Sequence, residues 1–283
     1  RRCDVEDAKA RAGLCGLAVM AKAPRAGAVK TRLQVALTAE QAAALNVCFL
    51  QDTTENLASV AAQGVAAGLI SYTPVGAEGL FDGLLPEEFA LVAQREDGFG
   101  ERLLRAAEDV LGCGFGSVCL IDSDSPTVPR EAYEQAVSEL AREGDRIVLG
   151  PSEDGGYYLI GMKRAEPRVF EKIAWSTGTV YAETLARAKE AWIEVVELPL
   201  WYDVDDAKTL GILRAELLMG LAPGFAATQG YKAERTRAKL MEMDLSMNAL
   251  RKLAPDAGGA ADAAVDQQER PGEDETLSQV EES

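Results

Sequence analysis

The sequence predicts an α/β fold built around a mainly parallel sheet. Short apolar runs of strand length alternate along the chain with longer segments whose apolar residues recur at helical spacing. This alternation is typical of βαβ units, in which helices cover a parallel sheet. No apolar run approaches the roughly 18 residues that a membrane-spanning helix needs, so a membrane span is not expected.

The expected elements follow one another in order. The first buried strand is Leu14–Ala21, and Thr38 and Gln41 form a capping-box start for an Ala-rich helix that ends near Gln63. The other expected strands are Leu69–Thr73, Phe89–Ala93, Ser117–Ile121, Ile147–Leu149, Tyr157–Gly161 and Ile193–Leu198. The other expected helices are Phe99–Leu111, Pro129–Arg142, Thr179–Trp192, Asp206–Met219 with Asp206 as N-cap, and Tyr231–Leu253.

Domain organisation follows from the pattern and from the distribution of charge. Residues 14–220 are expected to form the main domain, after an N-terminal extension of residues 1–13 and before a helical extension of residues 221–254. Residues 255–283 are expected to be a disordered acidic tail, because they are rich in Gly, Ala, Asp, Glu and Gln and poor in large apolar side chains.

Composition excludes several classes of function. The chain has no histidine, which rules out Ser-His-Asp and Cys-His catalysis and histidine metal sites. A metal would need oxygen ligands, which favours Mg²⁺ or Mn²⁺, or Ca²⁺, over Zn²⁺. A net charge of -17 argues against a nucleic-acid partner.

The cysteines and the first residues point to a reducing compartment. Five cysteines without Cys-x-x-Cys spacing favour buried free thiols over a disulfide framework. The polar start lacks the apolar segment of a signal peptide. We therefore expect a cytoplasmic protein.

A basic segment follows the first strand. The stretch from Leu17 to Ala39 has no acidic residue, although the chain as a whole is strongly acidic, and it holds Lys22, Arg25, Lys30 and Arg32. A strand-to-helix loop with free backbone N–H groups and cationic side chains is suited to binding phosphate. A solvated basic loop is the alternative interpretation.

Paired aspartates follow two of the expected strands. Asp122 and Asp124 come directly after Ser117–Ile121, and Asp203 and Asp205 come after the last strand. Open α/β sheets bind ligands at the carboxyl ends of their strands, so these carboxylates could hold one hard cation there. An ordinary turn and an acidic helix start would explain the same residues.

Two further loops carry residues that could contact a substrate. Asp154 precedes two glycines, Gly155 and Gly156, between expected strands. A type I′ hairpin turn would account for them, and so would a loop that receives an acceptor against bare backbone. Trp175 could stack on a sugar or base next to Ser176, although burial in a core is the commoner fate of a tryptophan.

Taken together and in this order, these motifs resemble the bacterial GT-A-type glycosyltransferase family, of the type linked in some genomes to arsenosugar biosynthesis. The similarity covers about Gly16 to Met219. The segments that carry it are Met20–Leu33, Gln94–Leu103, Ile121–Pro126, Glu153–Gly161, Trp175–Thr177 and Asp203–Asp205.

The resemblance implies a nucleotide-diphospho-sugar transferase-like fold, a Rossmann-like arrangement of three layers. It also implies that Asp124 is the principal metal carboxylate. Asp122 ranks behind it, because the family commonly has Gly at this position. The four cations at positions 22, 25, 30 and 32 would lie near the nucleotide phosphates.

The expected function is metal-dependent transfer of a sugar from a nucleoside-diphosphate sugar to a small acceptor. Mg²⁺ or Mn²⁺ would be held by Asp124 with help from Asp122 or Asp205. Asp154 would orient or deprotonate the acceptor, with Gly155, Gly156, Trp175 and Ser176 on the acceptor or sugar side.

Two other functions stay open at this point. One is nucleotidyl transfer of the guanylyltransferase kind, in which a nucleoside triphosphate is the substrate and pyrophosphate is released. The other is a nucleotide-binding module without catalysis, against which the repeated aspartates argue.

Overall fold

The computed structural model describes residues 8–95 and 98–253, with side chains as far as residue 245. The chain divides into two compact units after Glu242, and the whole sheet belongs to the first of them. The predicted tail at residues 255–283 lies outside the described residues, as do residues 1–7 of the predicted N-terminal extension.

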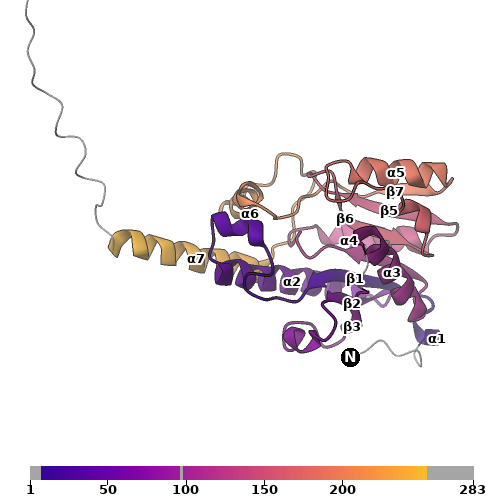
Figure 1. The fold of residues 1–283 in the computed structure, drawn as a ribbon, viewed down its shortest axis with the longest axis horizontal. Coiled ribbons are helices and arrows are strands. Elements are labelled where there is room, and N and C mark those ends of the chain that lie inside the picture. The colour runs from indigo at the N-terminus through magenta and orange to yellow at the C-terminus, as the bar shows by residue number, and fades with distance from the viewer. Residues whose placement is uncertain (1–7, 96–97, 254–283) are drawn as a thin grey trace, which may run out of the picture. The chain divides into compact units, whose positions relative to one another are not determined.

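The first unit is built on one seven-stranded sheet with the strand order β3-β2-β1-β4-β6-β5-β7 (Figure 1). Every neighbouring pair is parallel except the two pairs that involve β6. The predicted α/β class with a mainly parallel sheet is therefore confirmed. The strands are β1 (Cys15–Lys22), β2 (Ala66–Thr73), β3 (Ala90–Ala93), β4 (Ser117–Ile121), β5 (Arg146–Pro151), β6 (Tyr157–Met162) and β7 (Glu194–Glu197).

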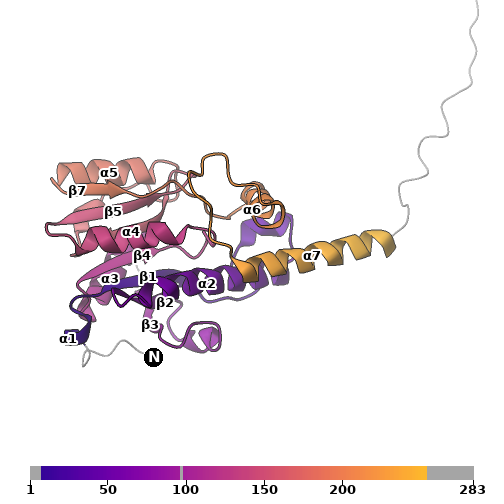
Figure 2. The ribbon, with the colours of Figure 1, turned by 180° about the vertical axis from the view of Figure 1, so that it is seen from behind.

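Helices cover both faces of the sheet and complete three layers. The helices α3 (Phe99–Gly112) and α5 (Val180–Glu190) lie over one face, and α2 (Ala39–Ala61) and α4 (Arg130–Ala141) lie over the other (Figures 1 and 2). The remaining elements are α1 (Ala8–Arg11), α6 (Ala207–Met219), α7 (Glu234–Leu253) and the short 3₁₀ helices η2 (Thr31–Val35), η3 (Glu78–Phe81) and η4 (Pro167–Val169).

Local sequence explains where these helices begin. The Thr38 side chain accepts a hydrogen bond from the backbone N–H of Gln41 at 3.1 Å, and the Gln41 side chain accepts one from the N–H of Thr38 at 2.9 Å. This is the predicted capping box of α2. Asp206 likewise caps α6 through the backbone N–H of Thr209 at 2.8 Å, as expected for an Asp that precedes an apolar helix.

The order of the strands determines where loops meet. From β1 the chain leads outwards to β2 and β3 on one side, whereas β4 lies on the other side of β1. Such a switch in direction leaves a crevice at the carboxyl ends of the two central strands. The loops after β1 and β4 therefore flank the same crevice, and they carry the basic segment and the first aspartate pair.

The segment between β7 and α6 returns to this crevice. Trp201 forms an isolated parallel bridge with Ser152, and the backbone N–H of Val204 donates a hydrogen bond to the carbonyl of Asp124 at 2.9 Å. Asp203 and Asp205 are thereby held next to the loop after β4.

The start of α7 is attached to α2 by a buried carboxylate. The two oxygens of Asp52 accept hydrogen bonds from the backbone N–H groups of Arg235 at 3.1 Å and Thr236 at 2.7 Å. Asp52 is fully buried. A side chain of one helix thus caps another that lies far away in the sequence, which sequence patterns do not reveal.

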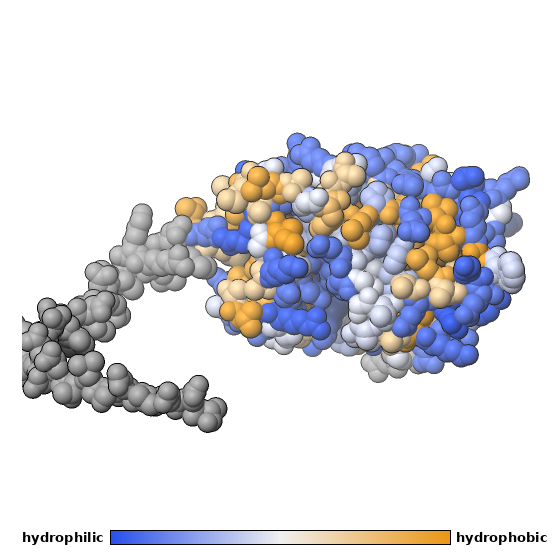
Figure 3. Space-filling view, turned by 90° about the horizontal axis from the view of Figure 1, so that it is seen from above, coloured by the Kyte–Doolittle hydropathy of each residue, from blue (hydrophilic) through white to orange (hydrophobic). Residues whose placement is uncertain are grey.

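The outer surface is mixed in character. The face shown in Figure 3 carries hydrophilic residues with apolar patches between them, which is ordinary for a water-exposed surface. None of the helices within the described ranges is long and apolar enough to cross a membrane.

The cysteines at 15, 48, 113 and 119 are free and buried, as the spacing predicted.

Candidate functional site

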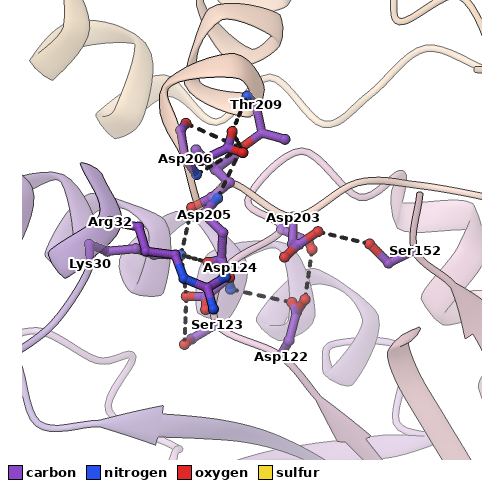
Figure 4. A network of polar contacts seen from close by, with 12 residues as sticks. Lys30, Arg32, Asp122, Ser123, Asp124, Ser152, Asp203, Asp205, Asp206 and Thr209 are labelled. Carbon is purple, nitrogen blue, oxygen red and sulfur yellow. Dashed lines mark hydrogen bonds and ion pairs between the residues drawn. The ribbon is translucent and has the colours of Figure 1, made fainter. Parts of the chain in front are cut away.

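Lys30 joins the three loops that meet at the crevice. Its ammonium lies 2.9 Å from Oδ1 of Asp124 and 3.0 Å from Oδ1 of Asp205, and it donates a hydrogen bond to the carbonyl of Val204 at 2.7 Å. Figure 4 shows Lys30 and Arg32 pointing towards these two aspartates. One side chain from the basic segment therefore links the loop after β4 to the segment after β7.

The backbone and the surroundings of Lys30 are unusual. Lys30 adopts a left-handed conformation with φ of 50° directly before η2, which is uncommon for a residue other than glycine. Only 4% of its side chain is exposed, and its ammonium lies 5.6 Å from the ring centre of Phe49. Burial alone would lower the pKa of Lys30, but the charges of Asp124 and Asp205 outweigh it and raise the pKa above its ordinary value.

Asp122 and Asp203 form a second pair of carboxylates beside this bridge. Oδ2 of Asp122 accepts a hydrogen bond from Oγ of Ser125 at 2.7 Å, and Oδ1 of Asp203 accepts one from Oγ of Ser152 at 3.0 Å. Burial raises the pKa of Asp122 well above its usual range, and the charge of Asp124 adds to this effect. Burial, followed by the charge of Asp154, raises the pKa of Asp203 to about 6. In both cases burial disfavours the charged carboxylate, and the charge of a neighbouring aspartate adds to that effect.

Two cavities adjoin the Lys30 bridge, and Arg32, Asp124 and Asp205 line both of them. The larger one has a volume of about 470 Å³. Among the residues that the structure describes, its lining includes five aspartates, at positions 122, 124, 154, 203 and 205, and Arg32 as the one cation. Its remaining wall is largely apolar and aromatic, with Met20, Phe99, Leu103, Leu120, Tyr157 and Trp175.

The smaller cavity has the opposite balance of charge. It has a volume of about 230 Å³ and is lined by the cations Lys22, Lys30 and Arg32, together with Thr31, Asn46 and the shared aspartates. Lys22 is exposed, and 76% of the Arg32 side chain is exposed, at 3.8 Å from Oδ2 of Asp205. Exposed cations around a small cavity are suited to binding a phosphate.

The predicted cations thus differ in their placement. Lys22 and Arg32 line the small cavity with free access to solvent, whereas Lys30 is buried and bonded to three protein oxygens. Arg25 is exposed and is not among the residues that line either cavity. The sequence pattern alone does not distinguish these four side chains.

The loop that carries Asp154 has a different turn from the type I′ alternative. Gly155 has a positive φ of 87°, but Asp154 does not, and type I′ requires a positive φ at both central residues. The loop is closed by a hydrogen bond from the N–H of Ser152 to the carbonyl of Gly156 at 3.0 Å. Oδ1 of Asp154 accepts a hydrogen bond from the N–H of Gly156 at 2.8 Å.

The glycines of this loop serve packing as well as the turn. A Cβ on Gly155 would lie 2.0 Å from the carbonyl oxygen of Gly178, so the bare backbone of Gly155 faces protein. Gly156 lines the large cavity beside Asp154. Of the two glycines, Gly156 is therefore the one that a substrate in this cavity could contact.

Trp175 is part of the wall of the large cavity. Its ring lies edge-on to Phe99, with ring centres 5.2 Å apart, and a Cβ on Gly100 would lie 2.5 Å from its indole nitrogen. Ser176 follows in a left-handed conformation with φ of 65° and also lines the cavity. Phe99 is 53% exposed and received no role from the sequence, because the first residue of an amphipathic helix looks like a core residue. Its position inside the Gln94–Leu103 motif was the available signal.

These carboxylates do not form a metal site as they stand. Their oxygens are the donors that Mg²⁺ or Mn²⁺ prefers, but within the described part of the chain no group of three or more acidic or cysteine side chains could hold an ion together. The ammonium of Lys30 lies between Asp124 and Asp205, where a cation shared by both would bind. The predicted metal therefore stays a prediction.

Comparisons with known proteins find one family profile and several solved structures that are similar to this chain. The family profile described as "Uncharacterized protein conserved in bacteria (DUF2064)" matches residues 56–177. The crystal structure of a "putative nucleotide-diphospho-sugar transferase" from Desulfovibrio desulfuricans G20 is 31% identical, with a TM-score of 0.68, over 83% of this chain and 97% of that one.

Other similarities are weaker. The CMP:2-keto-3-deoxy-manno-octonic acid synthetase in complex with CTP is 15% identical over 74% of this chain and 100% of that one, with a TM-score of 0.48. The 4-diphosphocytidyl-2C-methyl-D-erythritol synthase of Anaerococcus prevotii DSM 20548 is 11% identical over 74% and 99%, with a TM-score of 0.47. These two likenesses are too low to bear on this chain, and no curated protein sequence matches it.

The similarity to the protein from Desulfovibrio desulfuricans extends over nearly the whole length of that protein at 31% identity. The chain therefore belongs to the bacterial family of nucleotide-diphospho-sugar transferase-like proteins.

Proposed function

We propose that the protein is a transferase that moves a sugar from a nucleoside-diphosphate sugar to a small acceptor. The relative from Desulfovibrio desulfuricans, by its description, supports a nucleotide-diphospho-sugar as the substrate. The two adjoining cavities at the crevice support it independently, because such a substrate has a charged diphosphate next to an uncharged sugar.

The difference in charge between the two cavities carries the proposal. The small cavity offers Lys22 and Arg32 to an anion, which suits the diphosphate. The large cavity has five aspartates, one arginine and an aromatic wall. Carboxylates accept hydrogen bonds from sugar hydroxyls, and aromatic faces pack against the apolar side of a sugar ring. The sugar and a neutral or cationic acceptor therefore fit the large cavity.

The acidic lining of the large cavity supports glycosyl transfer over nucleotidyl transfer. In nucleotidyl transfer a second, phosphorylated substrate attacks the nucleotide, and its phosphate would have to enter beside the shared carboxylates. Like charges in a site of low dielectric are strongly unfavourable. Glycosyl transfer requires only an uncharged hydroxyl at that place, so we favour it over nucleotidyl transfer.

Individual residues receive roles on this basis. Asp154 and Asp203 lie on the acceptor side, and each could accept a proton or a hydrogen bond from an attacking hydroxyl. Phe99 and Trp175 would pack against the sugar. Lys22 and Arg32 would share the charge that develops on the leaving diphosphate. Dependence on Mg²⁺ or Mn²⁺ and the link to arsenosugar biosynthesis stay predictions from the resemblance.

The test is a product analysis with two sets of substrates. Nucleoside-diphosphate sugars with candidate acceptors should release a nucleoside diphosphate, whereas nucleoside triphosphates with sugar phosphates should release no pyrophosphate. Pyrophosphate release in the second set, without nucleoside diphosphate in the first, would replace glycosyl with nucleotidyl transfer.

Variants of the cations in the small cavity test whether the phosphates bind there. Changing Lys22 and Arg32 together to Ala should weaken nucleotide-sugar binding by about tenfold or more at low salt and reduce its salt dependence. Arg25→Ala is the matched control, because Arg25 is a cation of the same loop that lines neither cavity. Equal losses in the control and in the double variant would contradict the assignment of the small cavity.

A further inference from the structure

The strand β7 forms one edge of the sheet, and its outer side is open. β7 comes last in the strand order and pairs with β5 alone among the strands that the structure describes. Directly after β7, the N–H of Leu198 donates a hydrogen bond to the carbonyl of Leu149 in β5 at 2.8 Å. Because backbone groups alternate in direction along a strand, those of Val195 and Glu197 point away from β5. Such an edge is a template for a further strand.

An apolar groove adjoins this edge on the face that α5 covers. Figure 1 shows α5 and β7 together at one margin of the sheet. The groove has a volume of about 450 Å³ and is lined by Leu185, Lys189, Trp192, Ile193, Glu194 and Val195. Ile193 and Val195 pack against the same core as Leu185, and Glu197 accepts a hydrogen bond from the hydroxyl of Tyr181 in α5 at 2.5 Å. Ile193, Val195 and Glu197 therefore share the face on which the groove opens.

Trp192, just before β7, is both exposed and strained. It is 96% exposed, and its backbone is left-handed with φ of 57°, a conformation that bulky residues rarely adopt. A tryptophan in water also forgoes the free energy that burial of its large apolar surface contributes. Contact with a partner would offset both costs, and tryptophan is prominent among the residues that dominate protein interfaces.

The edge is complementary to a second copy of itself. A twofold axis perpendicular to the sheet at Val195 makes the two β7 strands antiparallel, with Val195 opposite its own counterpart. Glu194 then lies opposite Val196 of the other copy, and Ile193 lies opposite Glu197. No glutamate of β7 lies opposite another in this register, so the like charges that keep acidic edges apart do not meet. The outward groups of Val195 pair with those of its counterpart, and the N–H of Glu197 can donate to the carbonyl of Ile193.

The ends of the strand complete the fit. Lys189 is exposed and lines the groove together with Ile193, so it meets the exposed Glu197 of the second copy once at each end of the paired strands. Trp192 lies opposite the segment that follows β7 in the second copy, where Leu200 is 37% exposed. The net charge of -17 opposes association at long range, but physiological salt screens charges that are more than about 8 Å apart.

We propose that two copies of the chain associate through β7, so that their sheets join across a twofold axis and Trp192 of each copy packs against the other. The interface uses the same surface of both copies, as twofold dimers do. No residue of β7 lines either cavity at the crevice, so this dimer does not rest on the proposed function.

Sedimentation equilibrium of the full chain tests the dimer. The wild type should form a dimer at micromolar concentration. Trp192→Asn removes the indole while Asn tolerates the left-handed backbone, and it should raise the dissociation constant about tenfold or more. A wild type that stays monomeric at high micromolar concentration would overturn the proposal and leave the edge to a strand of a different protein. A dimer that Trp192→Asn does not weaken would overturn it as well.

Two proline variants separate this edge from the other one. Val195→Pro removes an outward N–H without breaking a hydrogen bond to β5, and it should abolish the dimer. Leu91→Pro is the matched control in β3, the opposite edge strand. The N–H of Gln94 donates to the carbonyl of Tyr72 in β2 at 2.7 Å, so that of Leu91 points outwards. Leu91→Pro should keep the dimer, and equal dimerisation of both variants would contradict the assignment to β7.

Charge reversal tests the register with variants that leave the core untouched. Lys189→Glu and Glu197→Lys each place like charges at both ends of the paired strands, so each variant should dimerise several-fold more weakly than the wild type. An equimolar mixture of the two variants has opposite charges at both ends and should form a heterodimer, detected by native mass spectrometry, in preference to either homodimer. A purely statistical distribution of the three species would overturn the twofold arrangement about Val195.

Discussion

Lys30→Met should reveal how much the buried Lys30 ammonium contributes to the stability of the protein. The substitution removes three hydrogen bonds, two of them to carboxylates, and a hydrogen bond to a charged group contributes about 1.5–3 kcal/mol. Water can solvate part of the two partly exposed aspartates, which reduces the loss. Met keeps an unbranched apolar side chain of similar length at this position. We therefore expect the free energy of unfolding to fall by about 2–4 kcal/mol, less than the roughly 5–15 kcal/mol of a typical domain.

Urea unfolding followed by circular dichroism measures this loss of free energy. In a separate thermal unfolding experiment, the melting temperature should fall by about 5–15 °C, at roughly 2–4 °C per kcal/mol for a domain of this size. A double-mutant cycle with Asp205→Asn should give a coupling energy of about 1 kcal/mol or more, because the two side chains are in direct contact.

Lys22→Met is the matched control for Lys30→Met. Lys22→Met should change the free energy of unfolding by no more than about 0.5 kcal/mol, since Lys22 is exposed. A loss below about 1 kcal/mol in Lys30→Met, or a coupling energy near zero with Asp205, would show that Lys30 does not join these loops in solution.

Three further predictions concern other parts of the first unit. Asp52→Ala should reduce the free energy of unfolding by about 1–2 kcal/mol in a urea titration, because it removes the cap of α7. Glu55→Ala breaks a surface ion pair with Arg235 of 3.6 Å, and it should reduce the free energy of unfolding far less. Burial raises the pKa of Glu216 above its ordinary value of 4.5, so its contribution to stability is complete at low pH and is lost as the pH rises through the raised pKa. The free energy of unfolding of the wild type should therefore fall relative to Glu216→Gln as the pH rises above the ordinary carboxyl pKa of 4.5, and parallel curves would contradict this assignment. Gly100→Ala should displace the Trp175 indole, since the new Cβ would lie 2.5 Å from the indole nitrogen. We expect a shift in tryptophan fluorescence and weaker nucleotide-sugar binding, with little loss of stability. Unchanged binding would exclude Trp175 from the substrate site.

Features encoded within a few neighbouring residues could be predicted from the sequence. The strand Ser117–Ile121 has the predicted bounds, and the caps at Thr38 and Asp206 are the predicted ones. Their causes are local: apolar runs bury strands, and short polar side chains satisfy free N–H groups at helix starts. The turn at Asp154 could not be predicted in this way, because Asp154–Gly155 is compatible with several turns and the closing hydrogen bond decides among them.

The sequence by itself also indicated which residue types would meet at the crevice. The absence of histidine excluded histidine catalysis and histidine metal sites, and the position of Asp124 after a strand placed it at the carboxyl edge of a parallel sheet. These conclusions need only the composition and the direction of the strands.

Only the tertiary structure decided which of the cations pairs with the aspartates and which stay exposed to solvent. Lys22 and Lys30 look alike in the sequence, yet one is exposed and the other is buried between Asp124 and Asp205. The reason is that an ion pair depends on distances of about 3 Å between loops that lie more than 90 residues apart, and no local pattern encodes such a distance. The capping of α7 by Asp52 and the aromatic wall of the large cavity arise in the same way, from side chains that only the packing of helices on the sheet brings together.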